Sequence, residues 1–179
     1  MSQQLKHISK LMSLVLRHKP DEIGLQLDEN GWAVVQELIE KINAKGIDIN
    51  AETINNIVAT NDKKRFAFNQ DKTMIRASQG HSIEVELNLP EAIPPGILYH
   101  GTTDRFLESI LANGLQKQNR QHVHLSATME TAAAVGSRHG KPVILTINAK
   151  SMHDAGYKFY LSANKVWLID SVPFQYITK

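Results

Sequence analysis

Residues 87–96 read LNLPEAIPPG, and this stretch divides the 179-residue chain. Its three prolines and one glycine form the densest group of helix- and strand-breaking residues in the sequence, which indicates a linker. A chain of this length can fold as one large domain or as two small ones. We therefore expect two lobes, one over residues 1–88 and one over residues 97–179, joined by a linker over residues 89–96.

The two sides of this linker differ in charge. Residues 1–95 contain 11 lysines and arginines against 13 acidic residues, a net charge of −2, whereas residues 96–179 contain 9 against 5, a net charge of +4. The formal net charge of the whole chain is only +2. This balance argues against a protein that binds nucleic acid through its overall charge, so any contact with nucleic acid must be local.

The composition excludes several classes of protein. The chain has no cysteine, which rules out a disulfide scaffold, thiolate catalysis and cysteine-based metal sites. With 42% hydrophobic and 21% charged residues, it has the composition of a folded globular protein. The polar start MSQQLKHISK and the short apolar stretch over residues 11–16 do not suit a signal peptide or a membrane span, so we expect a cytoplasmic protein without membrane contact.

In the first lobe, apolar residues at helical spacing precede a hairpin pattern. The spacing predicts helices over about residues 5–16 and 35–44, and a third helix that Asn50 can cap. Residues 65–68 and 73–76 flank a polar turn and predict a β-hairpin. Helices followed by a hairpin indicate a winged-helix lobe, a common plan among nucleic-acid-binding proteins.

In the second lobe, short strands alternate with two helices, which predicts a small α+β lobe. The sequence contains neither the GxGxxG pattern nor the Walker P-loop, so Rossmann-type dinucleotide binding and P-loop phosphoryl transfer are unsupported. The predicted strands are residues 97–100, 122–126, 143–147, 157–161 and 166–169, and the predicted helices are residues 106–113 and 129–136.

Three cationic residues, Arg17, His18 and Lys19, lie where the first helix must end before Pro20. An arginine fork and a histidine that titrates near neutral pH suit a phosphate dianion. Cations at the C-terminal end of a helix also stabilise the helix without any ligand, so both interpretations stay open.

Further basic and polar residues accompany the predicted hairpin. Lys64 and Arg65 open it, and Arg76, Gln79 and His81 lie on or just after its second strand. Such a hairpin suits a sugar–phosphate backbone, although the lysines equally suit a solvated turn.

In the second lobe, polar residues lie beside two predicted strands. His100, Gly101 and Thr102 lie between a strand and a helix, where glycine allows close approach of a ligand and its neighbours offer hydrogen bonds. His122 and His124 share one face of a strand, but no cysteine, aspartate or glutamate lies nearby in the sequence. We therefore expect a polar pocket or ordinary histidines there and no metal site.

Arg138 lies between two glycines at the end of a predicted helix. It belongs either to a C-terminal cap of that helix or to a site for an anionic ligand, and the sequence leaves both interpretations open. We find no paired-carboxylate pattern and no serine–histidine–aspartate pattern. An enzyme with these residues would stabilise phosphate charge electrostatically.

The order of these motifs resembles one family over about residues 5–174, the NAD-dependent RNA 2′-phosphotransferases, which include the tRNA splicing 2′-phosphotransferases and their bacterial members. The segments that carry the resemblance are LMSLVLRHKP, GLQLDENGW, KKRF, IRASQGHSI, LYHGT, HVHLS, GSRHGKP and SANKVWL. The resemblance implies an α+β protein with an N-terminal winged-helix lobe and a C-terminal lobe with an ADP-ribosyltransferase-like fold.

The resemblance also implies a reaction, the removal of an internal 2′-phosphate from RNA. In this family the phosphate attacks C1″ of the nicotinamide ribose of NAD and expels nicotinamide, which leaves a 2′-phospho-ADP-ribosylated RNA. Ribose O2″ then attacks the phosphorus, and the products are RNA with a 2′-OH and ADP-ribose 1″,2″-cyclic phosphate. We expect the chain to act on such RNA as a monomer that consumes NAD and needs no metal.

By this resemblance, three sets of residues receive roles. The catalytic set is Arg17, His18, Arg65 and Arg138. The RNA-binding set is Arg17, His18, Lys19, Lys64, Arg65, Arg76, Gln79 and His81, and the NAD-binding set is His100, Gly101, Thr102, His124, Ser126, Asn164 and Val166. The family commonly has glycine where this chain has Lys165, so we expect an adjusted turn beside Asn164.

Two other functions remain open. An ADP-ribosyltransferase that modifies a terminal phosphate of a nucleic acid, or a protein, would stop after the first step. A winged-helix regulator would sense NAD or ADP-ribose without turnover. The intact set of Arg17, His18 and Arg65 favours the phosphotransferase, because the second step needs these cations.

Overall fold

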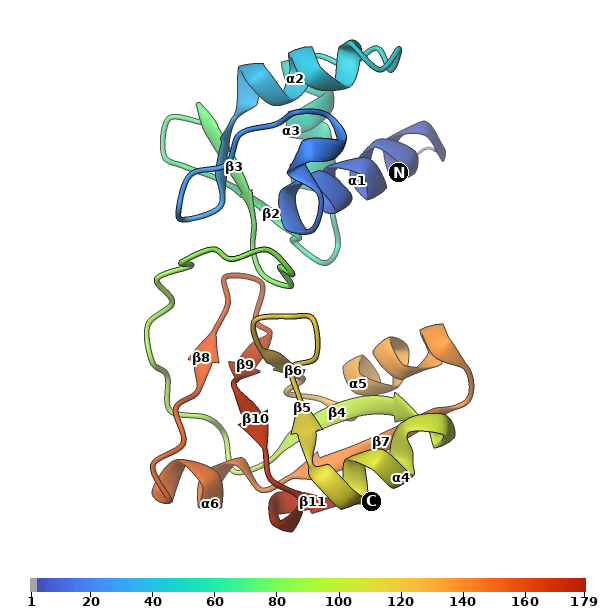
Figure 1. The fold of residues 1–179 in the computed structure, drawn as a ribbon, viewed down its shortest axis with the longest axis vertical. Coiled ribbons are helices and arrows are strands. Elements are labelled where there is room, and N and C mark those ends of the chain that lie inside the picture. Colours follow the sequence, from blue (N-terminus) through green and yellow to red (C-terminus); the bar gives the residue numbers. More distant parts are fainter. Residues whose placement is uncertain (1–2) are drawn as a thin grey trace. The chain divides into compact units, whose positions relative to one another are not determined.

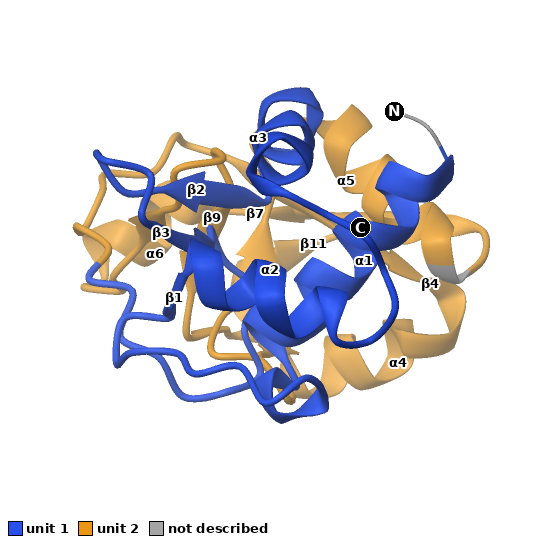
Figure 2. Ribbon diagram, turned by 90° about the horizontal axis from the view of Figure 1, so that it is seen from above, with its two compact units in different colours: residues 1–88 blue, residues 89–179 orange. Residues whose placement is uncertain are grey.

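The computed structural model describes residues 3–179, apart from the side chain of His139. The chain divides into two compact units, Met1–Asn88 (unit 1) and Leu89–Lys179 (unit 2), each with a hydrophobic core of its own (Figure 2). Both units combine helices with small antiparallel sheets, so the predicted α+β class is confirmed. Within residues 3–179, no helix has both the length and the apolar composition that a membrane crossing needs.

Over its described residues, 3–88, unit 1 contains three α-helices and one three-stranded sheet (Figure 1). In the sheet, β3 lies between β1 and β2 and pairs antiparallel with both. The helices are α1 (Gln3–Arg17), α2 (Val35–Asn43) and α3 (Ala51–Thr60), the strands are β1 (Trp32–Val34), β2 (Phe66–Phe68) and β3 (Met74–Ala77), and a 3₁₀ turn covers η1 (Pro20–Glu22).

Local sequence explains the helices of unit 1. In α1, Ile8, Met12 and Val15 recur at helical spacing and are almost completely buried, and Pro20 begins the next turn after the helix ends. At α3, the Asn50 side chain accepts a hydrogen bond from the Thr53 amide and completes a capping box. The three predicted helices and the predicted hairpin, formed by β2 and β3, are confirmed.

Unit 2 contains three α-helices around short antiparallel strands (Figure 1). Its sheets have the orders β11-β7-β4, β6-β9-β8 and β10-β5. The helices are α4 (Asp104–Asn113), α5 (Met129–Gly136) and α6 (Ala149–Asp154), with 3₁₀ turns at η2 (Ser137–His139) and η3 (Phe174–Tyr176). The strands are β4 (Leu98–Thr103), β5 (Leu115–Gln116), β6 (Val123–Leu125), β7 (Pro142–Ile147), β8 (Tyr160–Leu161), β9 (Trp167–Ile169), β10 (Ser171–Val172) and β11 (Ile177–Thr178).

Several bounds in unit 2 differ from the prediction. The strand predicted over residues 157–161 is limited to Tyr160–Leu161, and the strand predicted over residues 122–126 is limited to Val123–Leu125, followed by a single bridge between Ser126 and Tyr99. The strands β5, β10 and β11 were not predicted, because each has two residues and depends on a partner distant in the sequence. Helix α6 was also not predicted, although the Asn148 side chain caps it.

Residues 89–96 pack on unit 2. The Ala92 amide donates a hydrogen bond to the Phe159 carbonyl, and Glu91 forms a β-bridge with Tyr160. Ala92 also packs against the core of this unit. The proline-rich segment therefore runs along the surface of unit 2 as an ordered stretch of chain.

Candidate functional site

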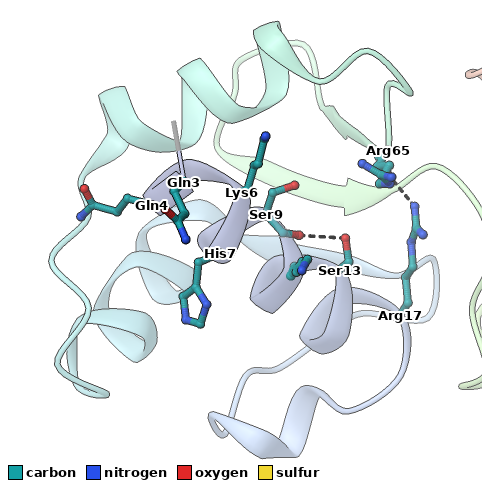
Figure 3. A pocket seen from close by; sticks show the side chains of 9 residues that line it. Gln3, Gln4, Lys6, His7, Ser9, Ser13, Arg17 and Arg65 are labelled. Atoms are coloured by element: carbon teal, nitrogen blue, oxygen red, sulfur yellow. Dashed lines mark hydrogen bonds between the residues drawn. The ribbon is translucent and has the colours of Figure 1, made fainter. Parts of the chain in front are cut away.

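In unit 1, the end of α1 lies against the start of β2. Arg17 is the last residue of α1, and its Nη2 donates a hydrogen bond of 3.4 Å to the carbonyl oxygen of Arg65 (Figure 3). Both side chains are half-buried. Two arginines that lie 48 positions apart in the sequence are thus brought together by the fold.

The segment before Arg65 is held by a buried side chain. Asn61 is 4% exposed, and its Oδ1 accepts hydrogen bonds from the amides of Lys63 and Arg65. The Arg65 carbonyl also accepts a hydrogen bond of 2.8 Å from the amide of Ser78. These bonds fix the backbone that carries Lys64 and Arg65, and Lys64 itself adopts a positive φ of 42°.

The loop after β3 closes against the end of α1. The Ser82 amide donates a hydrogen bond to the Arg17 carbonyl, and the Ser82 hydroxyl lies 2.9 Å from Nδ1 of His18. Gly80 adopts a φ of +87°, in the left-handed region that favours glycine, as the loop passes the guanidinium of Arg17. The predicted phosphate residues Arg17 and His18 are therefore held by a loop more than 60 positions further along the chain.

His81 lies behind these cations in the interior of unit 1. It is 1% exposed, and neither ring nitrogen has a hydrogen-bond partner among the described residues. The pKa of His81 is lowered to about 4, first by burial and then by the positive charges of Arg17, His18 and Arg76. The ring is therefore neutral at pH 7, and the cationic side chains that add to the effect of burial come from the end of α1 and from β3.

The other residues of the predicted RNA-binding set lie around this cluster. Arg76 lies on β3 opposite Trp32, with its guanidinium 4.5 Å from the centre of the Trp32 ring. Burial lowers the pKa of Arg76, and Asp28 partly opposes this effect. Lys19 is exposed just after α1, and Gln79 is half-buried in the loop after β3.

A groove of about 910 Å³, lined by polar and charged residue types, runs along α1 to Arg17 and Arg65 (Figure 3). Most of its lining comes from side chains of α1 that were not among the predicted site residues. The residues that line it are Gln3, Gln4, Lys6, His7, Ser9, Lys10, Ser13, Arg17 and Arg65.

In unit 2, the side chain of His100 on β4 forms a hydrogen bond with the backbone of His124 on β6. Nδ1 of His100 lies 3.0 Å from the carbonyl oxygen of His124, which makes this nitrogen the donor. Burial lowers the pKa of His100, the hydrogen bond to His124 raises it, and the charge of Arg120 lowers it. A neutral His100 that donates through Nδ1 leaves Nε2 as a hydrogen-bond acceptor.

Arg120 contacts the side chain of His124 and was not among the predicted site residues. Its Nη1 lies 2.8 Å from Nδ1 of His124, which assigns that ring the tautomer with its proton on Nε2. The pKa of Arg120 is lowered first by desolvation of its guanidinium and second by the charge of Arg138, although both side chains stay exposed overall. The only signal for Arg120 in the sequence was a cation four positions before His124.

Gly101 has a structural role that needs no ligand. A Cβ atom at this position would collide with the carbonyl of Ala132 in α5, so glycine allows α5 to pack on β4. Thr102 follows in β4 and is 7% exposed. The sequence predicted that a ligand approaches this glycine closely. In the structure, the backbone of α5 lies close to it.

The remaining residues of the predicted NAD-binding set lie in two turns. Ser126 pairs with Tyr99 through two backbone hydrogen bonds of 2.8 Å. Between β8 and β9, the Ser162 hydroxyl donates to Asn164 Oδ1, and the Val166 amide donates to the Ser162 hydroxyl oxygen. Lys165 adopts a φ of +63° in this turn, in the left-handed region that favours glycine.

The described residues contain no group of three or more histidine, aspartate or glutamate side chains that could hold a metal ion. His122 packs its ring against Tyr160, with ring centres 5.9 Å apart, whereas His124 contacts Arg120. The two histidines therefore have different partners.

Each unit thus brings arginine and histidine side chains together, in a protein of the α+β class. The chain belongs to the RNA 2′-phosphotransferase, Tpt1 / KptA family, whose model matches residues 3–171.

Curated relatives agree with this assignment over nearly their whole length. A protein of Flavobacterium johnsoniae is 62% identical over 172 residues, 96% of this chain and 94% of the relative. Proteins of Hahella chejuensis and Fusobacterium nucleatum are 56% and 57% identical, over 99% and 95% of this chain and 96% of each relative. All three are named "Probable RNA 2′-phosphotransferase".

Proposed function

We propose that the protein removes an internal 2′-phosphate from RNA by transferring it to NAD. Family membership supports the 2′-phosphotransferase activity. The observation that carries the proposal is the contact between the guanidinium of Arg17 and the backbone of Arg65, beside His18. In this proposal unit 1 is a winged-helix lobe that binds the phosphate, and unit 2 is an ADP-ribosyltransferase-like lobe that binds NAD.

The residues of unit 1 suit a phosphate that is already ionised. Arg17 and Arg65 offer planar donor groups for a dianion, and His18 adds a further donor. The phosphate oxygen attacks C1″ of the nicotinamide ribose, and the bond to nicotinamide breaks with its electron pair on nicotinamide. Because the nucleophile carries its charge from the start, this step needs no carboxylate base.

The second step concentrates negative charge on the oxygen atoms around the phosphorus. Ribose O2″ attacks it, the bond to the RNA 2′-oxygen breaks, and the proton of the O2″ hydroxyl ends on the RNA 2′-OH. Arg17, His18 and Arg65 lower the free energy of the crowded anionic transition state, and such fixed donors contribute about 3 kcal/mol each.

The residues of unit 2 suit the NAD molecule consumed in this reaction. Arg120 and Arg138 are close enough for the charge of one to lower the pKa of the other, and a diphosphate would relieve that repulsion. Neutral His100 presents Nε2 as an acceptor for a ribose hydroxyl. In the proposal Arg138 is the catalytic residue of this unit, and His124, Ser126, Asn164 and Val166 contact NAD.

Incubation with NAD and an oligonucleotide that carries one labelled internal 2′-phosphate tests the proposal. We expect the label in ADP-ribose 1″,2″-cyclic phosphate, together with free nicotinamide. Label that stays on an ADP-ribosylated oligonucleotide would identify an ADP-ribosyltransferase. Binding of NAD without release of nicotinamide would identify a non-catalytic sensor, and either result would overturn the proposal.

A further inference from the structure

Four polar side chains of α1 lie on one face of the helix. Lys6, Lys10, Ser13 and Arg17 occupy positions i, i+4, i+7 and i+11, which fall on one stripe of an α-helix. All four line the groove that leads to Arg65. Figure 3 labels Lys6, Ser13 and Arg17 among them. We call these four residues the α1 stripe.

The charge of the α1 stripe contrasts with the rest of unit 1. Residues 1–88 contain 11 lysines and arginines against 12 acidic residues, a net charge of −1. Helix α1 contains no acidic residue, and none lines the groove. The α1 stripe therefore places three cationic side chains on one helix face, with no acidic side chain beside them in the groove.

Hydrogen bonds anchor the two serines in the floor of the groove, Ser9 and Ser13. Ser13 donates a hydrogen bond of 2.8 Å from its hydroxyl to the Ser9 carbonyl, which leaves its oxygen as an acceptor. Ser9 is 6% exposed, and its hydroxyl oxygen accepts a hydrogen bond from Asn61. Because Asn61 also holds the Arg65 amide, one buried side chain ties the groove floor to the Arg65 backbone.

The length of the stripe fits a nucleic acid strand. An α-helix rises 1.5 Å per residue, so the stripe extends about 17 Å from Lys6 to Arg17, and Lys6 and Lys10 are separated by about 6 Å along the axis. This separation is comparable to that between successive phosphates of an extended single strand. Lysine binds phosphodiesters as a flexible point charge, whereas the arginines at the other end suit the dianion.

We propose that the groove along α1 binds the single-stranded RNA backbone next to the 2′-phosphate, over about two nucleotides on one side. This inference rests on the proposed function, since it takes the end of the groove at Arg17 and Arg65 as the position of the 2′-phosphate. Lys6 and Lys10 neutralise the flanking phosphodiesters, and the Ser13 oxygen accepts a hydrogen bond from a ribose hydroxyl.

The test compares the double variant Lys6→Gln/Lys10→Gln with the control Lys41→Gln/Lys45→Gln. The control removes the same charge from unit 1, at residues that do not line the groove. Fluorescence anisotropy without NAD measures binding of 2′-phosphorylated oligonucleotides at several salt concentrations. One oligonucleotide is just long enough to carry the internal phosphate, and two others extend it by about four nucleotides on the 5′ or the 3′ side.

We expect the wild type to bind one extended oligonucleotide more tightly than the short one. In Lys6→Gln/Lys10→Gln this gain disappears, and the slope of log K against log salt falls by about 1.4 in magnitude, because each single-strand phosphate contact contributes about 0.7. The control keeps both the gain and the slope. Equal gain and equal slope in Lys6→Gln/Lys10→Gln and wild type would overturn the inference.

Turnover with NAD separates this inference from the proposed function. Turnover of the short oligonucleotide by the wild type tests the proposed function, because this substrate does not extend along the groove. If no oligonucleotide is processed while the length-dependent binding still requires Lys6 and Lys10, the proposed function fails and the groove remains an RNA site. If the short oligonucleotide is processed and extension brings no tighter binding, the groove inference fails alone.

Discussion

The guanidinium of Arg17 is held by its surroundings before any ligand binds. It extends from the last turn of α1 to the Arg65 carbonyl, and the loop with Gly80 passes beside it. A group fixed in this way loses little conformational freedom on binding phosphate, which favours a planar arginine over a flexible lysine.

This geometry predicts a large effect of Arg17→Lys on turnover. Lysine keeps the charge but loses the planar donor pair, so we expect kcat to fall about 100-fold, similar to the loss of one fixed donor in a transition-state site. Single-turnover assays with NAD and 2′-phosphorylated RNA measure the effect. Arg105→Lys is the control, because Arg105 lies in α4 against Phe106, and it should leave kcat unchanged. A wild-type rate for Arg17→Lys would remove the planar donor pair from the mechanism.

Buried His81 predicts a pH dependence of stability. Its pKa is about 4 in the folded state against about 6.5 in the unfolded state, so between these values only the unfolded chain binds the proton. The free energy of unfolding should therefore fall as the pH drops from 6.5 to 4, by about 3 kcal/mol at most.

Urea unfolding of wild type and His81→Gln at several pH values isolates this contribution. The variant shifts the baseline stability at every pH, but it lacks the titrating ring, so the difference between the two proteins should shrink as the pH falls below 6.5. A difference that stays constant between pH 7 and pH 4 would show that the ring is protonated as readily in the folded protein as in the unfolded chain.

At the scale of elements, contacts between backbones decide where glycine is required. Helix α5 packs on β4 and β7, and its Ala132 carbonyl occupies the space that a side chain at residue 101 would need (Figure 1). The polar residues of β4 next to this contact, His100 and Thr102, depend on the same packing for their position.

Gly101→Ala should therefore destabilise the protein severely. The added methyl group meets backbone that cannot rotate away, so we expect a loss of about 3 kcal/mol, at the upper end of overpacking effects. Thermal unfolding measures it, with Gly96→Ala as the matched control, because a Cβ at Gly96 has no neighbour within 4 Å. Equal melting temperatures for the two variants would contradict this account of Gly101.

At the scale of the whole molecule, each unit has its own core. The buried cluster of unit 1 extends from Ile8 to Ala77, and that of unit 2 extends from Leu98 to Val172. The two clusters share no residue, and the proline-rich residues 89–96 pack with unit 2.

Residues 89–179 alone should consequently fold as a cooperative unit. A fragment of this size with a complete core buries enough apolar surface for a single sharp transition. Thermal unfolding followed by circular dichroism, with the full chain as the reference, measures it. A fragment without a cooperative transition would show that its core depends on residues 1–88.

The sequence determined the local features of this protein. Helical spacing, the Asn50 cap, the Pro20 stop and the hairpin alternation depend on neighbours within a few residues, so the three helices and the hairpin of unit 1 were predictable. The motifs also identified Arg17, His18 and Arg138 as candidate ligand-binding residues. They indicated the same family as the family model that matches residues 3–171.

Only the tertiary structure decided which of these residues meet. Arg17 reaches Arg65 across 48 positions and His18 reaches Ser82 across 64, and no local pattern encodes such pairs. His81 was predicted to bind RNA and is 1% exposed in the interior of unit 1. Arg120 was not among the predicted site residues, and the fold brings it close enough to Arg138 for the charge of Arg138 to lower its pKa. The physical reason is that periodicity records which face of an element is apolar, whereas burial and convergence depend on how distant elements pack.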